Sequence, residues 1–170
     1  NNVGGIAGIT TIGLTYSVNY GNVSGASNVG GIVGSNTGAL LQNVSNVGTI
    51  NGSGSNVGGI IGLHTSTGSL SLALNTGVVT GGSVVGSLVG SQTTSATTVN
   101  SFWDTDSSLL NASGGVGSNT GGIFIATPGC FSGTCTNGGT GTNLSAQGTY
   151  TGVGFAFGSD ISWRIIAGNT

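Results

Sequence analysis

Few side chains in this sequence could carry acid–base or nucleophilic chemistry. The chain has one histidine, His64, and three acids, Asp104, Asp106 and Asp160. A serine or threonine nucleophile needs a positioned base, so a hydrolytic triad would have to bring His64 together with Asp104 or Asp160. A single histidine beside a turn, as in the phrase GLHTSTG, is more typical of a structural residue. We therefore predict no catalytic residues and no enzyme activity.

The sequence also offers few side chains that could bind a metal ion or take part in redox chemistry. Asp104 and Asp106 match the first acidic positions of a calcium-binding EF-hand loop. The glycine and glutamate that complete such a loop are absent, which favours a structural turn. Cys130 and Cys135 flank a turn-like segment, and a pair of cysteines alone lacks two of the four ligands that zinc needs. We predict a local disulfide between Cys130 and Cys135, no metal site and no cofactor. Such a disulfide indicates an extracytoplasmic protein.

Composition excludes other classes of function. Charged residues make up 2% of the 170-residue chain, which has a single arginine or lysine and a formal net charge of −2. Binding to nucleic acid needs several cationic side chains to neutralise phosphates, so we expect no nucleic-acid partner. No run approaches the roughly 18–20 apolar residues of a membrane span, so we expect a chain that does not span a membrane. Disordered chains combine high net charge with few large apolar residues, and this chain has neither feature.

Two phrases recur with one period, and they indicate how the chain is organised. The first is NVGG followed by two apolar residues and glycine, and the second is an asparagine two residues before a glycine. They begin at Asn2, Asn28, Asn56 and, in decayed form, Val84, and at Asn19, Asn46 and Asn75. The first phrase recurs at steps of 26–28 residues and the second at steps of 27 and 29. A shared period of this length indicates stacked repeats, because such units cannot bury an apolar face alone.

The pattern of each repeat predicts short strands separated by turns. Glycine at this density costs about 1 kcal/mol per residue in a helix, whereas the short β-branched segments between Gly, Asn and Ser are typical of strands. We predict an all-β fold, a parallel β-solenoid with three short strands and one coil per repeat. Residues 1–98 would form the repeat coils. Residues 99–170 would form irregular, aromatic-rich coils of the same domain, with a cysteine-containing insertion at 114–137.

Stacking predicts which residues meet. Each residue lies over its counterpart one coil away, so a repeated charge would face its own copy, whereas amide side chains can form ladders. The narrowest part of the coil should lie at the paired glycines, such as Gly30–Gly31, where backbones approach closely. The expected columns are an asparagine ladder of Asn19, Asn46 and Asn75, the glycines Gly21, Gly48 and Gly77 that follow it, and an aliphatic stack of Leu14, Leu41 and Leu70.

Three aromatic residues allow two interpretations. Phe102, Trp103 and Trp163 could form a platform on which a sugar ring stacks. Alternatively they close the wider end of the solenoid, because aromatic side chains bury large areas. We favour closure and keep the glycan platform as the alternative.

The repeat resembles the GLUG-type repeat of large bacterial surface proteins. Its core appears as GIAG at 5–8, GIVG at 31–34, GIIG at 59–62 and, in decayed form, SLVG at 87–90. The phrase VNSFWDTDSS at 99–108 is similar to the phrase that closes such arrays, and residues 138–168 are similar to the family's usual tail.

The resemblance implies a secreted or surface-displayed β-solenoid like the passenger regions of filamentous-haemagglutinin-like adhesins, with no catalytic residues. We expect an extracellular structural protein, either a filament subunit that stacks end to end with itself or a rigid adhesin module flanked by further coils. The alternatives are glycan binding and ice binding. Ice binding is the weaker alternative, because the threonine pairs Thr10 and Thr11, Thr65 and Thr67, and Thr97 and Thr98 do not recur at one register of the repeat.

Overall fold

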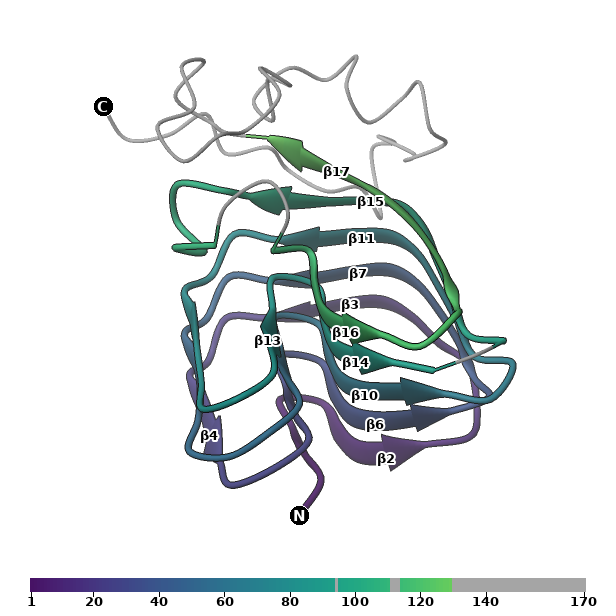
Figure 1. Ribbon diagram of the computed structural model, residues 1–170, viewed down its shortest axis with the longest axis horizontal. Helices are drawn as coiled ribbons and strands as arrows, with labels where there is room; N and C mark the ends of the chain where they lie inside the picture. The colour runs from purple at the N-terminus through teal and green to yellow at the C-terminus, as the bar shows by residue number, and fades with distance from the viewer. Residues whose placement is uncertain (94, 111–113, 130–170) are drawn as a thin grey trace.

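The computed structural model describes residues 1–93, 95–110 and 114–129, and this part of the chain is a parallel β-solenoid (Figure 1). The first coil contains β1 (Val3–Gly4), β2 (Ala7–Thr10), β3 (Leu14–Asn19) and β4 (Val23–Gly25). The second contains β5 (Val29–Gly30), β6 (Val33–Thr37), β7 (Leu40–Asn46) and β8 (Ile50–Gly52). The third contains β9 (Val57–Gly58), β10 (Ile61–Thr65), β11 (Ser69–Asn75) and β12 (Val79–Thr80). The upper coils contain β13 (Val85–Gly86), β14 (Val89–Gln92), β15 (Thr97–Asp104), β16 (Val116–Asn119) and β17 (Ile123–Gly129).

The strands stack into four parallel sheets, which confirms the predicted fold class. Sheet A has the order β1-β5-β9-β13, sheet B β2-β6-β10-β14-β16, sheet C β3-β7-β11-β15-β17 and sheet D β4-β8-β12. We expected three strands in each coil, and the structure has four in the first three coils. The additional strand belongs to sheet A and is only two residues long, too short to show an alternating pattern in the sequence.

The coil encloses two separate apolar cores. The larger core lies between sheets B and C and includes Ile32, Leu41, Ile60 and Leu70. The smaller core lies between sheets A and D and is formed by valines and one isoleucine, Val23, Val29, Ile50, Val57 and Val79. The predicted aliphatic stack belongs to the larger core, where Leu14 lies beside Leu41 and Leu41 beside Leu70.

Residues 114–129 continue the solenoid. They fall in the expected insertion 114–137, but β16 pairs in parallel with β14 and β17 pairs in parallel with β15. The predicted start of the insertion, at residue 114, was therefore wrong. Residues 114–129 keep the stacking register, although the repeat phrase is no longer recognisable in them. Residues 130–137 lie outside the described residues.

A column of residues with positive φ bends four of the five strands of sheet C, namely β3, β7, β11 and β15. Tyr16, Asn43, Leu72 and Asn100 occupy one register position, and all four have positive φ, between 49° and 53°. Residues with a Cβ pay about 1–2 kcal/mol in this left-handed region, and asparagine tolerates it best. Two of the four coils therefore use a residue poorly suited to the bend.

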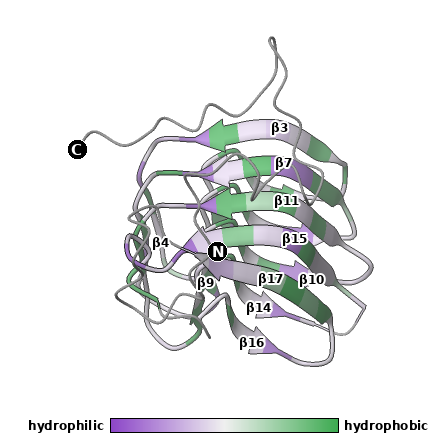
Figure 2. Cartoon of the chain, turned by 90° about the horizontal axis from the view of Figure 1, so that it is seen from above, coloured by the Kyte–Doolittle hydropathy of each residue, from purple (hydrophilic) through white to green (hydrophobic). Residues whose placement is uncertain are grey.

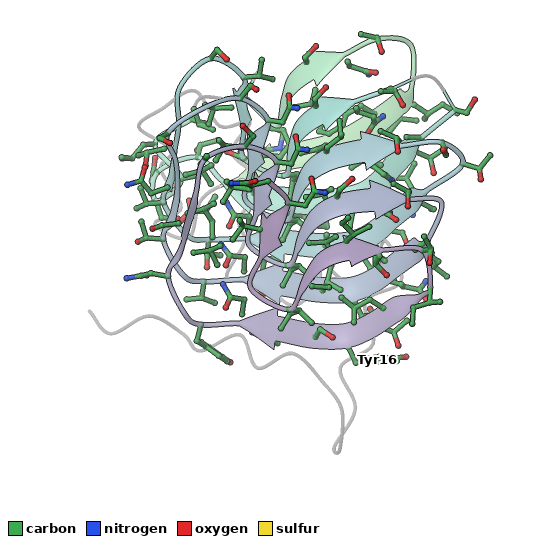
Figure 3. All side chains as sticks on the ribbon, turned by 90° about the horizontal axis from the view of Figure 1, so that it is seen from below. Tyr16 is labelled. Atoms are coloured by element: carbon green, nitrogen blue, oxygen red, sulfur yellow. The ribbon has the colours of Figure 1, made fainter. Side chains whose placement is uncertain are left out.

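Tyr16→Asn should therefore stabilise the protein. Tyr16 is 59% exposed on the first coil (Figure 3), so little packing is lost when its ring is removed. We expect the free energy of unfolding to rise by about 1 kcal/mol, measured by urea denaturation. Tyr20→Asn is the matched control, because Tyr20 is 73% exposed and lacks a positive φ. Equal effects of the two substitutions would show that the backbone conformation is not the cause.

Candidate functional site

The only histidine lies inside the solenoid. His64 is 0% exposed and pairs in register with Asn36 on one side and Gln92 on the other. Neither imidazole nitrogen has a hydrogen-bond partner. Burial lowers the pKa of His64 from 6.5 to about 4, against the opposite influence of the nearby polar groups of Gly68 and Gln92. A side chain enclosed in this way cannot meet a substrate, and the structure does not bring it beside Asp104.

Asp104 forms part of a turn at the end of β15. It is 6% exposed, and its carboxylate accepts hydrogen bonds from the Asp106 N–H and the Ser107 hydroxyl. Its backbone carbonyl accepts a further hydrogen bond from the Ser108 N–H at 3.0 Å. The part of the chain that the structure describes holds no group of three or more His, Cys, Asp or Glu side chains that could bind a metal ion.

The aromatic pair of β15 is buried, and Trp103 belongs to the larger core. Phe102 is 3% exposed and Trp103 is 2% exposed, and Trp103 packs against Phe124 with ring centroids 6.5 Å apart. A sugar-stacking platform needs an exposed ring face, which the rings of Phe102 and Trp103 do not offer in this structure. Burial of these rings fits the favoured interpretation, in which aromatic side chains close the wider end of the solenoid.

The remaining predicted residues fall outside the described part. Cys130, Cys135, Asp160 and Trp163 all lie between residues 130 and 170. The disulfide prediction and the third member of the aromatic platform therefore stay predictions.

The best-defined polar feature is a ladder at the waist between the two cores. Asn19, Asn46 and Asn75 end β3, β7 and β11 and lie in register on successive coils, and Figure 2 shows the hydrophilic ends of these strands in one line. Asn19 Nδ2 donates to Asn46 Oδ1 and Asn46 Nδ2 donates to Asn75 Oδ1, both at 2.8 Å. We call these three residues the waist ladder.

Each amide of the waist ladder also closes its own turn. Asn75 Nδ2 donates to the Gly77 carbonyl at 3.1 Å, and the Gly77 N–H donates to Asn75 Oδ1 at 3.2 Å. Asn19 makes the same pair of bonds with Gly21, at 2.7 and 3.1 Å. The turn therefore fixes which end of each amide points up the solenoid.

The paired glycines make room for this ladder. A Cβ at Gly31 would lie 2.5 Å from Asn46 Cγ, and one at Gly5 would lie 2.8 Å from Asn19 Cγ. Contacts this short are not seen for real Cβ atoms, so the second glycine of each pair is required where it faces an asparagine. The predicted narrow place is the waist.

A second ladder had not been predicted. Asn28 Nδ2 donates to Asn2 Oδ1 at 2.7 Å and Asn56 Nδ2 donates to Asn28 Oδ1 at 2.8 Å. Asn28 and Asn56 have positive φ of 47° and 59°, which asparagine tolerates. The signal was present in the first residue of the NVGG phrase. We call Asn2, Asn28 and Asn56 the outer ladder.

The first coil leaves one complete edge open. All four sheets end at a strand of this coil, β1, β2, β3 and β4. Ile6 is 46% exposed, whereas Ile32 and Ile60, at the same position in the next two coils, are 0% exposed. Six of the exposed large apolar side chains belong to this coil, namely Ile6, Ile9, Ile12, Tyr16, Val18 and Tyr20. We call this surface the lower edge, and Figure 3 looks onto it from below.

No family model, no curated protein and no solved structure matches this chain. The likeness to GLUG-type repeats therefore stays a resemblance. Among the described residues, no helix is long and apolar enough to cross a membrane.

One of the threonines considered for ice binding belongs to a column of threonines at the end of sheet B. Thr65 lies in register beside Thr37, and each hydroxyl donates to a backbone carbonyl of the coil below. Each residue of the neighbouring polar column, from Thr10 to Asn119, is followed by a threonine, which gives the column Thr11, Thr37, Thr65, Thr93 and Thr120. Thr10 and Thr97 lie beside Asn36 and Ser69 and are not part of it. Ice binding therefore stays an alternative prediction.

Proposed function

We propose that this protein is a non-catalytic, extracellular structural β-solenoid that forms one segment of a longer stack of coils. The observation that carries the proposal is the lower edge. The columns that are sealed inside the second and third coils, such as Ile32 and Ile60, continue into the first coil as exposed apolar side chains such as Ile6. A further coil placed there would bury them as the second coil buries the first.

The chemistry of the edge supports association with another β-coil. An uncovered strand edge offers backbone N–H and C=O groups for pairing, and soluble proteins usually protect such edges with charges or proline. The sequence has no Asp, Glu, Lys or Arg before Asp104 and its single proline is Pro128, so the lower edge carries neither device. Contacts between coils made of backbone hydrogen bonds and apolar side chains would be little affected by salt.

The extracellular setting is supported by sequence features. The resemblance to repeats of bacterial surface proteins and the close spacing of Cys130 and Cys135 both favour secretion or display at the cell surface. Two structural versions follow from the same edge, a subunit of a surface filament and a rigid module of an adhesin. They differ in whether the added coil comes from another chain.

Negative-stain electron microscopy and sedimentation velocity, over a hundredfold range of protein concentration, distinguish the two versions. Regular unbranched fibres would identify a filament subunit, and uniform small particles at every concentration would identify a module. Where fibres form, Ile6→Lys should stop their growth, because it places a charge on the lower edge. Val47→Lys is the matched control, because Val47 is 47% exposed between β7 and β8 of the second coil, away from either edge of the described stack. Fibres that form equally with Ile6→Lys would contradict assembly through the lower edge.

A further inference from the structure

The lower edge carries polar groups with a fixed direction. In the waist ladder every interaction between coils runs upward, from Nδ2 of one asparagine to Oδ1 of the asparagine on the next coil. Asn75 Oδ1 accepts two hydrogen bonds, from Asn46 Nδ2 and from the Gly77 N–H. Asn19 Oδ1 occupies the equivalent position on the first coil and accepts from the Gly21 N–H. The donor that would correspond to Asn46 Nδ2 would have to come from a coil below.

The outer ladder runs in the opposite direction. Asn28 Nδ2 donates downward to Asn2 Oδ1, and Asn56 Nδ2 donates downward to Asn28 Oδ1. Continued by one step, Asn2 Nδ2 would donate to an acceptor on a coil below. The lower edge therefore presents one acceptor, Asn19 Oδ1, and one donor, Asn2 Nδ2.

The upper coils in the described chain do not carry the matching groups. Above Asn75 the waist position is occupied by Trp103 and then by Pro128. The outer position after Asn56 is Val84, whose backbone carbonyl accepts from the Val57 N–H. A second copy stacked head to tail through these coils would offer neither asparagine.

We propose that the occupant of the lower edge is a parallel coil of the same repeat class that carries asparagine at both ladder positions. Its waist asparagine would donate to Asn19 Oδ1, and its outer asparagine would accept from Asn2 Nδ2. The apolar columns of the first coil supply most of the contact, and the two amides select the register and the kind of coil. This inference rests on the proposed function, since it names the partner of the same edge.

The test adds a coil of this kind to the whole chain. A second copy of residues 28–55 is placed before Asn2 in place of Asn1, so that the new junction repeats the natural Ser55–Asn56 step. We expect the midpoint of thermal unfolding to rise by about 4–8 °C and the β-sheet circular dichroism to increase, because solenoid stability grows with each interface between coils. No increase in either quantity would contradict the proposed function itself.

A double-mutant cycle then tests the role of the amide. Asn46→Ala in the added copy also weakens that copy's own turn, so its effect is measured with Asn19 intact and again with Asn19→Ala. Coupled residues give non-additive effects, and we expect at least half of the loss in unfolding midpoint to disappear when Asn19 is already alanine. Additive losses would overturn the inference while leaving a stable added coil and the proposed function intact.

The original chain provides an independent check. Head-to-tail fibres formed by the chain without the added coil would show that its upper coils satisfy the lower edge, and would overturn the inference in favour of a second copy. Uniform particles of that chain, together with coupling between the two asparagines, are the expected results.

Discussion

Replacing Asn46 with alanine should lower the free energy of unfolding by about 3 kcal/mol. Asn46 is 0% exposed and lies in the middle of the waist ladder. Its Nδ2 donates to the Gly48 carbonyl and to Asn75 Oδ1, each at 2.8 Å, and its Oδ1 accepts from Asn19 Nδ2. Alanine leaves these buried groups without that partner, and each unsatisfied polar group costs about 1–3 kcal/mol. Chemical denaturation monitored by circular dichroism measures the loss.

The same coil offers a matched control. Asn51 lies on β8 with its side chain exposed, so Asn51→Ala should change the free energy of unfolding by less than about 0.5 kcal/mol. Gly31→Ala would not isolate the ladder, because its Cβ would meet the Gly59 backbone carbonyl oxygen even more closely than Asn46 Cγ, 2.5 Å away. Similar small effects of Asn46→Ala and Asn51→Ala would show that the ladder contributes little to stability.

The ladder at the waist could be predicted because identical residues recur there. Asparagine returns at positions 19, 46 and 75, each two residues before a glycine, and parallel stacking then places the three side chains together. The solenoid itself followed from the same argument, because a shared period with short β-branched segments leaves few other ways to bury an apolar face. Repetition of residue type is the signal that survives in a single sequence.

Columns that change residue type gave no such signal. Thr10, Asn36, His64, Gln92 and Asn119 occupy one register position at the corner between sheets B and C. Their shared property is a polar side chain that can close the loop beside it. That property depends on the length of the loop, which the repeat period does not reveal.

The lengths of side chain and loop change together at this corner. Asn36 bonds to the backbone of Ala39 and Asn119 bonds to that of Gly122, each three residues on. Gln92, whose side chain is longer, donates to the carbonyl of Ala96, four residues on, at 3.3 Å. His64 stands before a loop of the Gln92 kind, ending at Gly68, but its ring makes no hydrogen bond there. This relation is visible only in the folded structure.

The sequence also did not show which of two neighbouring aromatic side chains faces the core. Phe102 and Trp103 are consecutive residues of one strand, and strict alternation would place them on opposite faces. Trp103 belongs to the larger core, whereas Phe102 is buried but belongs to neither core, as alternation requires. Alternation alone does not say which of two consecutive apolar side chains faces the core, and the sequence offers no other signal for it.

His64 has an unusual environment for a group that can take up a proton. It is 0% exposed between Asn36 of β6 and Gln92 of β14, and a Cβ at Gly68 would lie 2.8 Å from its Nε2, so the loop is close to the ring. None of the sequence before Asp104 contributes an Asp or Glu side chain that could pair with an imidazolium. Protonation inside the folded solenoid would therefore place an uncompensated charge among neutral groups.

Stability should consequently fall as the pH is lowered through the range of this histidine. Burial holds the pKa of His64 at about 4, below its ordinary value of 6.5, so between these values the unfolded chain binds a proton that the folded chain does not. The stabilisation is complete above about pH 6.5 and is lost progressively as the pH falls toward 4, by about 3 kcal/mol in total at 1.36 kcal/mol per unit of pKa.

His64→Gln provides the decisive comparison, because glutamine already serves this corner at position 92, before a loop of the same length. The chain has one histidine and no glutamate, so the variant removes the main group that titrates in this window. Urea unfolding at pH 7.0, 5.5 and 4.5 should show a falling free energy for the natural chain and a nearly flat one for His64→Gln. Parallel pH profiles for the two proteins would mean that His64 is not buried as a neutral ring, and that the acid sensitivity arises elsewhere in the chain.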